Sequence, residues 1–581
     1  MRAALFVALL SAHAHRARAA EPPCDVLVAG GSLASLAAAV AAANASLALS
    51  PSSPASVCLL EITDWLGGQA TASATSAIDF GETWTNFPKN VPRAFAEALT
   101  SPGFGPAAFN PGGCTVSKKC FLPSRFVAWA DALIATLPNL RVYRSTAVTA
   151  VARDGATGRV TSVTAVARAP TPAHASGYDR LLSAALLDWY SPVDSAFFTK
   201  QTLVFDVPAR GVVVEGTEFG DVLLLGALGV TQGGEEVEAA PTPARESCGQ
   251  STTVCFWTSW DETAAPTPDP WPRGSDGGHP IPPFNSSVPH NSLAWDLVWR
   301  RSLATDPSDD THPRQGDVSL LNGGSPGAND ENYAYVFEPI EEARASAMIG
   351  AYAGGVDLLA LAVAEARAYA FYHHLVDALP ANLPAAVGFF TLNATAAGTE
   401  TGLAKMPYLR DTRRASSGVG GFRLCHHFAA PNGTGPGPAG CGAGSAGSPG
   451  KNGHGFHWAD TVALGAYDFD IHRMLSCELP AYLNFCYPSC AAGLPYYLPW
   501  RALTHAESPN LLLAGKTMAQ SFYANAITRL HPSEWSSGAA AGAGAALMVA
   551  RNWTSTDVFD NVAVLQALLV TDAVGVPIEW T

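Results

Sequence analysis

The stretch Cys24–Glu61, CDVLVAGGSLASLAAAVAAANASLALSPSSPASVCLLE, contains in order the parts of a βαβ unit. Val26–Val28 is a short apolar run typical of a buried strand, and a turn of very small residues follows it. Leu36–Ala45 is rich in Ala, which favours a helix, and Val57–Leu60 is a second apolar strand that ends on the acid Glu61. This order predicts a unit that binds a dinucleotide.

Each part of the unit has a chemical role in such a site. Small residues let backbone N–H groups approach a pyrophosphate, and the helix N-terminus adds free donors and a positive dipole. We therefore expect Gly30, Gly31, Ser32 and Ser35 to surround the pyrophosphate and Glu61 to hold the adenosine ribose. Serines replace the second and third glycines of the usual G-x-G-x-x-G pattern, so a plain Ala-rich βαβ unit is the alternative.

Further motifs follow this unit along the chain. TDWLGGQ comes almost directly after the acid, and NLLLAGK, RLHP and GAAAG lie near the C-terminus. In four ordered segments the chain resembles the FAD-dependent oxidoreductase family, over roughly residues 24 to 551: Leu59–Gln69, Thr217–Asp221, Gly402–Arg414 and Asn510–Ala543.

The resemblance implies FAD, rather than NAD, as the cofactor. It also implies that Gly67, Gly68 and Gln69 line the ribityl chain or the flavin edge. A second group is expected to close the cofactor from the other side, with N–H donors at a helix start that face the developing negative charge of the flavin. This second group contains Gly515, Arg529, Gly538 and Gly542.

The expected fold class is α/β, a Rossmann-like FAD-binding domain with an inserted mixed α+β substrate or cap domain. We predict a first FAD-binding part over residues 20–230, with a β meander over 139–170, and a return segment over 501–555. Residues 231–500 form the cap domain with Pro/Gly-rich insertions, and 556–581 form a C-terminal tail. Helices are predicted at Val127–Leu137 and Val356–Leu379, and a third covers Gly538–Arg551.

Two histidines are candidates for acid/base chemistry. His531 lies between the last strand and the last helix, where a neutral imidazole can take a proton as hydride leaves, and a structural role is the alternative. His472 is the second candidate. The basic cluster of Arg410, Arg413 and Arg414 could hold an anion or form ion pairs within an acidic protein. No complete set of metal ligands is visible, so no metal is expected.

Composition and charge restrict the partners. The chain has 581 residues and a formal net charge of −15, which argues against nucleic acid and anionic membranes and leaves a small-molecule substrate. The N-terminus has Arg2, an apolar run over Ala3–Ala12 and a small-x-small site at Ala17–Ala19, which predicts a signal peptide over residues 1–19. The run is too short for a stable membrane anchor, and the oligomeric state stays open.

Cysteines and sequons also point to the secretory pathway. The 11 cysteines lack zinc spacing, and several are close enough for small disulfide loops, whereas Cys58 in a buried strand is expected to be a free thiol. The close sets are Cys114 and Cys120, Cys248 and Cys255, Cys425 and Cys441, and Cys477, Cys486 and Cys490. The N-x-S/T sequons lie at Asn44, Asn285, Asn393, Asn432 and Asn552.

These observations predict a secreted FAD-dependent oxidoreductase that transfers hydride from a small organic substrate to flavin. Two alternatives remain: a non-catalytic glycoprotein with weak or lost FAD, and a flavin-dependent lyase or isomerase. The motifs of rival machinery, G-x-S-x-G, the P-loop and H-E-x-x-H, do not occur in the sequence.

Overall fold

The computed structural model describes residues 19–79, 89–100, 110–117, 119–234, 246–263, 300–309, 313–322, 335–382, 389–429, 454–472 and 493–581. The signal peptide predicted for residues 1–19 lies outside this part except for Ala19. Residues 266–283 and nearly all of residues 431–455, which hold the Pro/Gly-rich insertions, lie outside it as well, as do Asn285 and Asn432.

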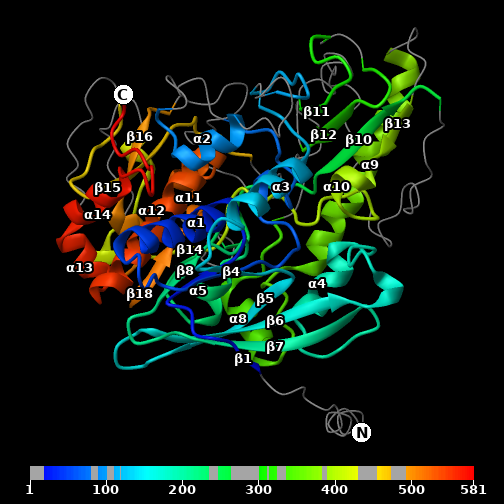
Figure 1. The fold of residues 1–581 in the computed structure, drawn as a ribbon. Coiled ribbons are helices and arrows are strands. Elements are labelled where there is room, and N and C mark those ends of the chain that lie inside the picture. Colours follow the sequence, from blue (N-terminus) through cyan, green and yellow to red (C-terminus); the bar gives the residue numbers. More distant parts are fainter. Residues whose placement is uncertain are drawn as a thin grey trace, which may run out of the picture.

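A six-stranded sheet with the order β17-β18-β8-β2-β3-β4 forms the centre of the molecule (Figure 1). Its five strands from β18 to β4 are parallel, and β17 runs antiparallel to β18 at one edge. The strands are apolar on both faces, as expected of a parallel sheet that is covered on both sides. Their bounds are β2 Val26–Ala29, β3 Val57–Leu60, β4 Leu140–Tyr143, β8 Val212–Glu215, β17 Thr504–His505 and β18 Ser508–Leu513.

Two helices made of small residues cover one face of this sheet. Helix α1, Leu33–Leu49, and helix α12, His531–Arg551, pack along each other (Figure 1). A Cβ atom at Gly538 would lie 1.9 Å from the carbonyl oxygen of Ala34, and one at Gly542 would lie 2.0 Å from that of Ala38. The glycines therefore permit a backbone contact that any larger residue would prevent.

The expectation that Gly538 and Gly542 present N–H donors to the flavin is wrong. Helix α12 begins at His531, so both glycines lie within it, where backbone N–H groups bond to the preceding turn. Pro532 occupies the first turn of α12, where the missing N–H of proline costs nothing.

A second sheet, antiparallel except for the parallel pairing of its edge strand β1 with β7, covers the other face of the parallel sheet. It has the order β1-β7-β6-β5, with β1 Ala19–Ala20, β5 Thr146–Arg153, β6 Val160–Pro170 and β7 Phe198–Asp206. Leu203, Val163 and Val148 of this sheet pack with Leu27 and Val213 of the parallel one. The predicted meander over 139–170 needs a correction, because β4 at its start pairs in parallel with β3 and belongs to the central sheet.

The middle of the chain forms a second hydrophobic core, which it shares with residues of the first part such as Trp189 and Phe219. A four-stranded sheet of order β11-β12-β10-β13 lies beside the long helix α9 at the upper right of Figure 1. Helix α9 spans Leu358–Asn382, close to the prediction of Val356–Leu379. The strands are β10 Phe256–Asp261, β11 Arg301–Leu303, β12 Val318–Leu321 and β13 Phe389–Leu392, and α8 is Ile340–Met348.

Shorter elements complete the described part. Helix α3 begins at Pro123 rather than Val127, with the proline in its first turn. The other helices are α2 Arg93–Thr100, α3 Pro123–Ile134, α4 Leu182–Tyr190, α5 Asp221–Leu225, α10 Ala394–Ala397, α11 Phe522–Thr528, α13 Ser555–Asp560 and α14 Val562–Leu569. The remaining strands are β9 Val230–Thr231, β14 Arg414–Ala415, β15 Thr461–Gly465 and β16 Tyr496–Pro499.

The cysteines depart from one expectation. Cys58 is not a free thiol, because it forms a disulfide with Cys24, which precedes the neighbouring strand. Cys114 and Cys120 form the predicted small loop. Cys248 is disulfide-bonded, whereas the nearby Cys255 is a buried thiol, so these two do not pair. The disulfides among the described residues are compatible with secretion.

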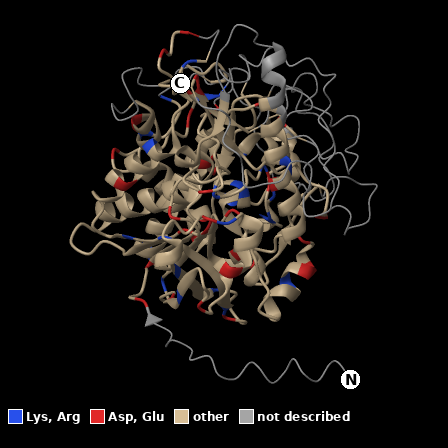
Figure 2. Cartoon of the chain, turned by 90° about the vertical axis from the view of Figure 1, so that its right-hand side faces the viewer, with Lys and Arg blue, Asp and Glu red and all other residues tan. Residues whose placement is uncertain are grey.

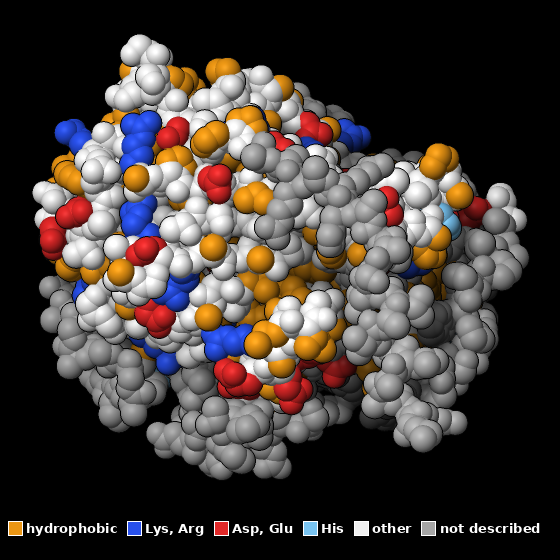
Figure 3. All heavy atoms as spheres, turned by 90° about the horizontal axis from the view of Figure 1, so that it is seen from below, with side chains coloured by type: hydrophobic (Ala, Val, Ile, Leu, Met, Phe, Trp, Pro, Cys, Tyr) orange, Lys and Arg blue, Asp and Glu red, His pale blue; other side chains and the backbone are white. Residues whose placement is uncertain are grey.

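The surface of the described part carries both signs of charge. Figure 2 shows Lys, Arg, Asp and Glu spread over helices, strands and loops rather than gathered in one basic stripe. Seen from below, charged and hydrophobic side chains are interspersed, and hydrophobic ones gather near the middle of that face (Figure 3). Within the described residues, no helix combines the length and the apolar character needed to cross a membrane.

Candidate FAD site

The glycine loop between β2 and α1 packs closely against the residues that follow β8. Gly30 has a φ of +92°, and a Cβ atom there would lie 2.5 Å from Cα of Thr217. Ser32 caps α1, since its Oγ accepts from the N–H of Ser35 at 3.2 Å, and the Ser35 hydroxyl donates to the carbonyl of Gly216 at 3.0 Å. The two serines that replace glycines therefore fix the loop and the helix start.

The segment Thr217–Asp221 folds back over the end of β8. Glu215 accepts from the N–H groups of Thr217 and Val222, each at 2.5 Å. Burial and the charge of Asp221 raise the pKa of Glu215 to about 8. This turn brings Glu218 beside the glycine loop, since a Cβ atom at Gly68 would lie 2.7 Å from Oε1 of Glu218.

Glu61 ends β3 and faces the same loop. Its Oε1 accepts from the N–H of Thr63 at 2.7 Å and from the Thr63 hydroxyl at 2.5 Å. A Cβ atom at Gly31 would lie 2.1 Å from the other carboxylate oxygen. Burial raises the pKa of Glu61 to about 7, despite the hydrogen bonds from Thr63.

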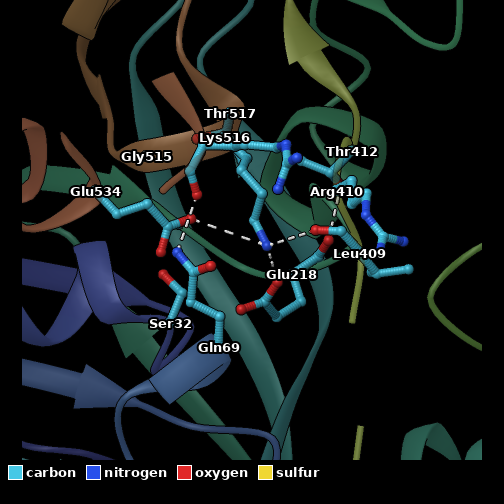
Figure 4. Close-up of polar contacts among 12 residues, drawn as sticks. Ser32, Gln69, Glu218, Leu409, Arg410, Thr412, Gly515, Lys516, Thr517 and Glu534 are labelled. Carbon is cyan, nitrogen blue, oxygen red and sulfur yellow. Dashed lines mark hydrogen bonds and ion pairs between the residues drawn. The ribbon is translucent and has the colours of Figure 1, made fainter. Parts of the chain in front are cut away.

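A buried lysine lies between two carboxylates beside this loop (Figure 4). Nζ of Lys516 is 2.6 Å from Oε2 of Glu218 and 3.9 Å from Oε1 of Glu534, and it donates to the carbonyl of Leu409 at 3.0 Å. Burial opposes the lysine charge, but the two carboxylates outweigh burial and raise the pKa of Lys516. Burial raises the pKa of Glu534 to about 7.

These groups fit FAD because several buried acceptor atoms lack donors. In the described part of the chain, Oε1 of Gln69, Oε1 of Glu218 and both carboxylate oxygens of Glu534 have no hydrogen-bond partner. Such atoms destabilise a fold unless a ligand or water supplies donors. The ribose and ribityl hydroxyls of FAD are donors, and its pyrophosphate suits the start of α1 and the ammonium of Lys516.

His531 is the first residue of α12, the helix that also contains Glu534. Its Nε2 is 2.8 Å from the carbonyl oxygen of Thr75. Since a carbonyl only accepts, Nε2 carries the hydrogen and Nδ1 holds the lone pair. Nδ1 is buried without a partner among the described residues. Burial, together with the cations Arg300 and Lys516, lowers the pKa of His531 to about 3, so the imidazole is neutral.

Arg529 and His472 are linked through one carboxylate. Arg529 donates to Oδ2 of Asp470 at 2.8 Å and to the hydroxyl of Tyr408 at 2.6 Å, and its carbonyl accepts from Nε2 of Gln69 at 2.9 Å. His472 pairs with Asp470 at 3.0 Å. Burial disfavours the Asp470 carboxylate, but His472 and Arg529 outweigh it and hold its pKa well below the usual range. His472 is thus linked to Arg529 through Asp470.

The basic cluster after Lys405 has a structural role. Arg413 donates to the carbonyls of Phe219, Gly354 and Gly355 at 2.7–2.9 Å. Arg410 donates to the carbonyl of Ser251 at 2.7 Å, and Arg414 donates to that of Gly233 at 2.7 Å. All three are buried, and these contacts connect segments of the chain rather than face an open anion site.

The structure brings most of the predicted cofactor residues together. Around the start of α1 it gathers Gly30, Gly31, Ser32, Ser35, Glu61, Gly67, Gly68, Gln69 and Gly515. Gly515 has a φ of +62° and lies against Ala34 and Glu534. The sequence analysis did not select Glu218, Lys516 or Glu534, although each is a charged residue inside a quoted motif. The described residues contain no cluster of three His, Cys, Asp or Glu that could hold a metal.

Residues 25–569 match the family described as FAD dependent oxidoreductase. The chain belongs to this family. It is therefore a flavoenzyme of the FAD-dependent type. A search of curated proteins found no match.

Solved structures of flavoenzymes show low similarity to the chain. p-Nitrophenol 4-monooxygenase PnpA from Pseudomonas putida DLL-E4 is 13% identical, with a TM-score of 0.20 over 41% of this chain and 47% of that chain. Quinol fumarate reductase FrdA of E. coli is 10% identical, with a TM-score of 0.27 over 94% and 74%. The enzyme spans about half the length of the first structures it resembles.

FAD binding should tighten as the pH rises through the titration of Glu61. Ribose hydroxyls donate to a carboxylate, and with a pKa of about 7 the free protein carries this group protonated at lower pH. The Kd for FAD should fall about tenfold per pH unit up to about pH 7 and then level off. Because the folded pKa lies above the ordinary 4.5, the unliganded protein should lose stability as the pH rises over the same range.

Fluorescence titration of the apoprotein with FAD at a series of pH values measures this slope. Glu61→Gln is the matched control, because an amide cannot titrate, and its Kd should depend less steeply on pH below 7, with the remaining slope assigned to Glu534, whose pKa is also about 7. An equal slope in both proteins would assign the pH dependence to another group.

Proposed function

We propose that this flavoenzyme transfers hydride from a small organic substrate to FAD in the space between residues 69–76 and 529–536. The observation that carries the proposal is the unpartnered Nδ1 of His531, a buried neutral base at this place. The same two segments hold other buried polar atoms without partners in the described chain: Nε of Arg529 and the hydroxyls of Ser73, Thr75, Ser76 and Ser536. A bound ligand would satisfy such atoms.

The roles of the residues follow from their atoms. FAD supplies the two-electron acceptor when it is bound. Residues Gly30 to Ser35 would bind the pyrophosphate, Glu61 the ribose, and Gln69, Glu218 and Glu534 the hydroxyl-bearing chain. His531 would accept the substrate proton at Nδ1, while Thr75 holds the ring by its Nε2–H. The Nε–H of Arg529 would orient the substrate.

We assign residues 231–500 to a cap over this space and residues 20–230 with 501–555 to FAD binding. The β11-β12-β10-β13 sheet shares no strand with the central sheet, which supports a cap unit, and its core packs against Trp189 and Phe219 of the first part. The cap contributes Tyr408 and Asp470, which hold Arg529 in place.

Flavin reduction by candidate substrates tests the function. The purified protein should show the two-band absorption of oxidised flavin, and an oxidisable substrate should bleach it under anaerobic conditions. Turnover with persistent colour and no consumption of an electron acceptor would instead identify a lyase or isomerase. Acid precipitation before the spectrum separates covalent from non-covalent FAD.

Secretion is a separate proposal, supported by the Cys24–Cys58 and Cys114–Cys120 disulfides and the N-terminal sequence. Asn552 is exposed after the end of α12 and should carry the glycan. Asn393 should stay unmodified, because its amide caps α10 and donates to Ser259 at 2.6 Å, and Asn44 lies within α1. Peptide mass spectrometry of protein from a eukaryotic host, with and without glycan removal, measures this. An unmodified Asn552 in secreted protein would contradict it.

A further inference from the structure

A buried arginine lies beside the expected ribose site with one donor unused. Arg168 on β6 is 6% exposed, and its Nη1 has no hydrogen-bond partner in the described part of the chain. Lys200, which is opposite Arg168 on β7, is 2% exposed but pairs with Asp188 at 2.9 Å and donates to the carbonyl of Ser191 at 3.1 Å. Of these two neighbouring buried cations, only Lys200 is compensated by a carboxylate in contact.

Arg168 is held in a fixed orientation. Its guanidinium carbon lies 3.9 Å above the ring centre of Trp189, a buried residue of α4, and 5.6 Å from that of Phe198. The Tyr178 hydroxyl interacts with the same guanidinium. Stacking on an aromatic face stabilises a guanidinium but satisfies none of its N–H groups. The free Nη1–H is therefore fixed in place for an acceptor.

The backbone places Arg168 next to the loop that follows Glu61. The N–H of Arg168 donates to the carbonyl of Ser145 at 2.9 Å, and the N–H of Ser145 donates to the carbonyl of Thr63 at 2.8 Å. Glu61 and Asp64 act electrostatically on the guanidinium, yet burial prevails and lowers its pKa. A buried guanidinium whose charge is disfavoured in this way requires a further hydrogen-bond acceptor.

We propose that Arg168 binds the adenosine half of FAD, with its Nη1–H donating to a ring-nitrogen or ribose acceptor. Adenosine is uncharged, so it tolerates the two acids Glu61 and Asp64, whereas a free anion would be repelled by them. The position beside Glu61, the residue assigned to the ribose, selects this half of the cofactor over the flavin half. The assignment does not depend on hydride transfer, since it concerns cofactor affinity alone.

Titration of the apoprotein with ADP, FAD and FMN tests the proposal, because FMN lacks adenosine. In Arg168→Met the Kd for ADP and FAD should rise about 10- to 100-fold, the effect of one hydrogen bond from a charged donor, and the Kd for FMN should not change. Removing an uncompensated buried charge should leave the protein folded. Arg180→Met is the matched control, since Arg180 also stacks, at 3.4 Å on Phe197, but pairs with Asp188.

Three results would overturn the proposal. Unchanged affinities for ADP and FAD in Arg168→Met would make Arg168 a packing residue. An equal loss of FMN affinity would indicate a general disturbance of the site rather than loss of an adenosine contact. Binding of inorganic phosphate to the wild type that Arg168→Met abolishes, with FAD affinity intact, would identify a free-anion site. Failure of substrates to reduce the flavin would leave these affinities, and the proposal, unaffected.

Discussion

Gly30→Val should yield a protein that no longer retains FAD. Gly30 has a φ of +92°, a region in which valine is strained, and its Cβ would lie 2.5 Å from Cα of Thr217 and 2.6 Å from the oxygen of Gly216. Both are backbone atoms at the end of β8, so the glycine loop rather than its neighbour must move. Strain and overlap together cost about 2–6 kcal/mol, which corresponds to a loss of affinity of at least about 30-fold.

The ratio of flavin to protein after gel filtration, together with the melting temperature, measures this effect. Gly155→Val is the matched control, because Gly155 lies in the turn between β5 and β6 with no heavy atom within 4 Å of its Cβ position. Gly31→Ala is a second test of the same loop, to be used if Gly30→Val does not fold. Its Cβ would lie 2.1 Å from Oε2 and 2.8 Å from Cβ of Glu61, so the Glu61 side chain must shift and FAD affinity should fall. Normal FAD retention in Gly30→Val would remove the loop from the pyrophosphate site.

The first βαβ unit was predictable because its signals are local. Apolar strands, a small-residue turn and an Ala-rich helix follow each other directly, and the structure has β2, α1 and β3 where the sequence indicates them. The predicted helix boundaries were less accurate where a residue is compatible with both a loop and the first turn of a helix. The sequence analysis placed RLHPSEW before the last helix, yet α12 already begins at His531 with Pro532 in its first turn, so the predicted helix began seven residues late.

The charged centre of the site was not predictable from local pattern. Lys516 and Glu218 are 298 residues apart, and only the pairing of β18 with β8 brings their loops together. Cys58 shows the same difficulty, because its partner Cys24 precedes the neighbouring strand and becomes adjacent only through the register of β2 and β3. The role of a residue inside a motif can therefore be assigned only when its neighbours in space are known.

His531→Ala should leave FAD binding intact and slow flavin reduction by about 10²–10⁴-fold, the range for loss of a positioned base. The reasoning starts from the tautomer, in which the Thr75 carbonyl holds the hydrogen on Nε2 and leaves Nδ1 as a free acceptor. A pKa of about 3 makes this base weak, so the effect should lie toward the lower end of the range. Its ionisation should also be absent from the rate profile above about pH 5.

His505 provides the matched control, because it is equally buried and also contacts a carbonyl, that of Gly229, through Nε2 at 2.9 Å. Its Nδ1 is already occupied by the N–H of Glu507 at 3.1 Å, so it has no lone pair left for a substrate. Stopped-flow reduction should therefore be fast in His505→Ala and slow in His531→Ala, with partial rescue of the latter by added imidazole. Unchanged reduction in His531→Ala, with only a lower melting temperature, would show that the histidine ties the 69–76 segment to α12 and takes no proton.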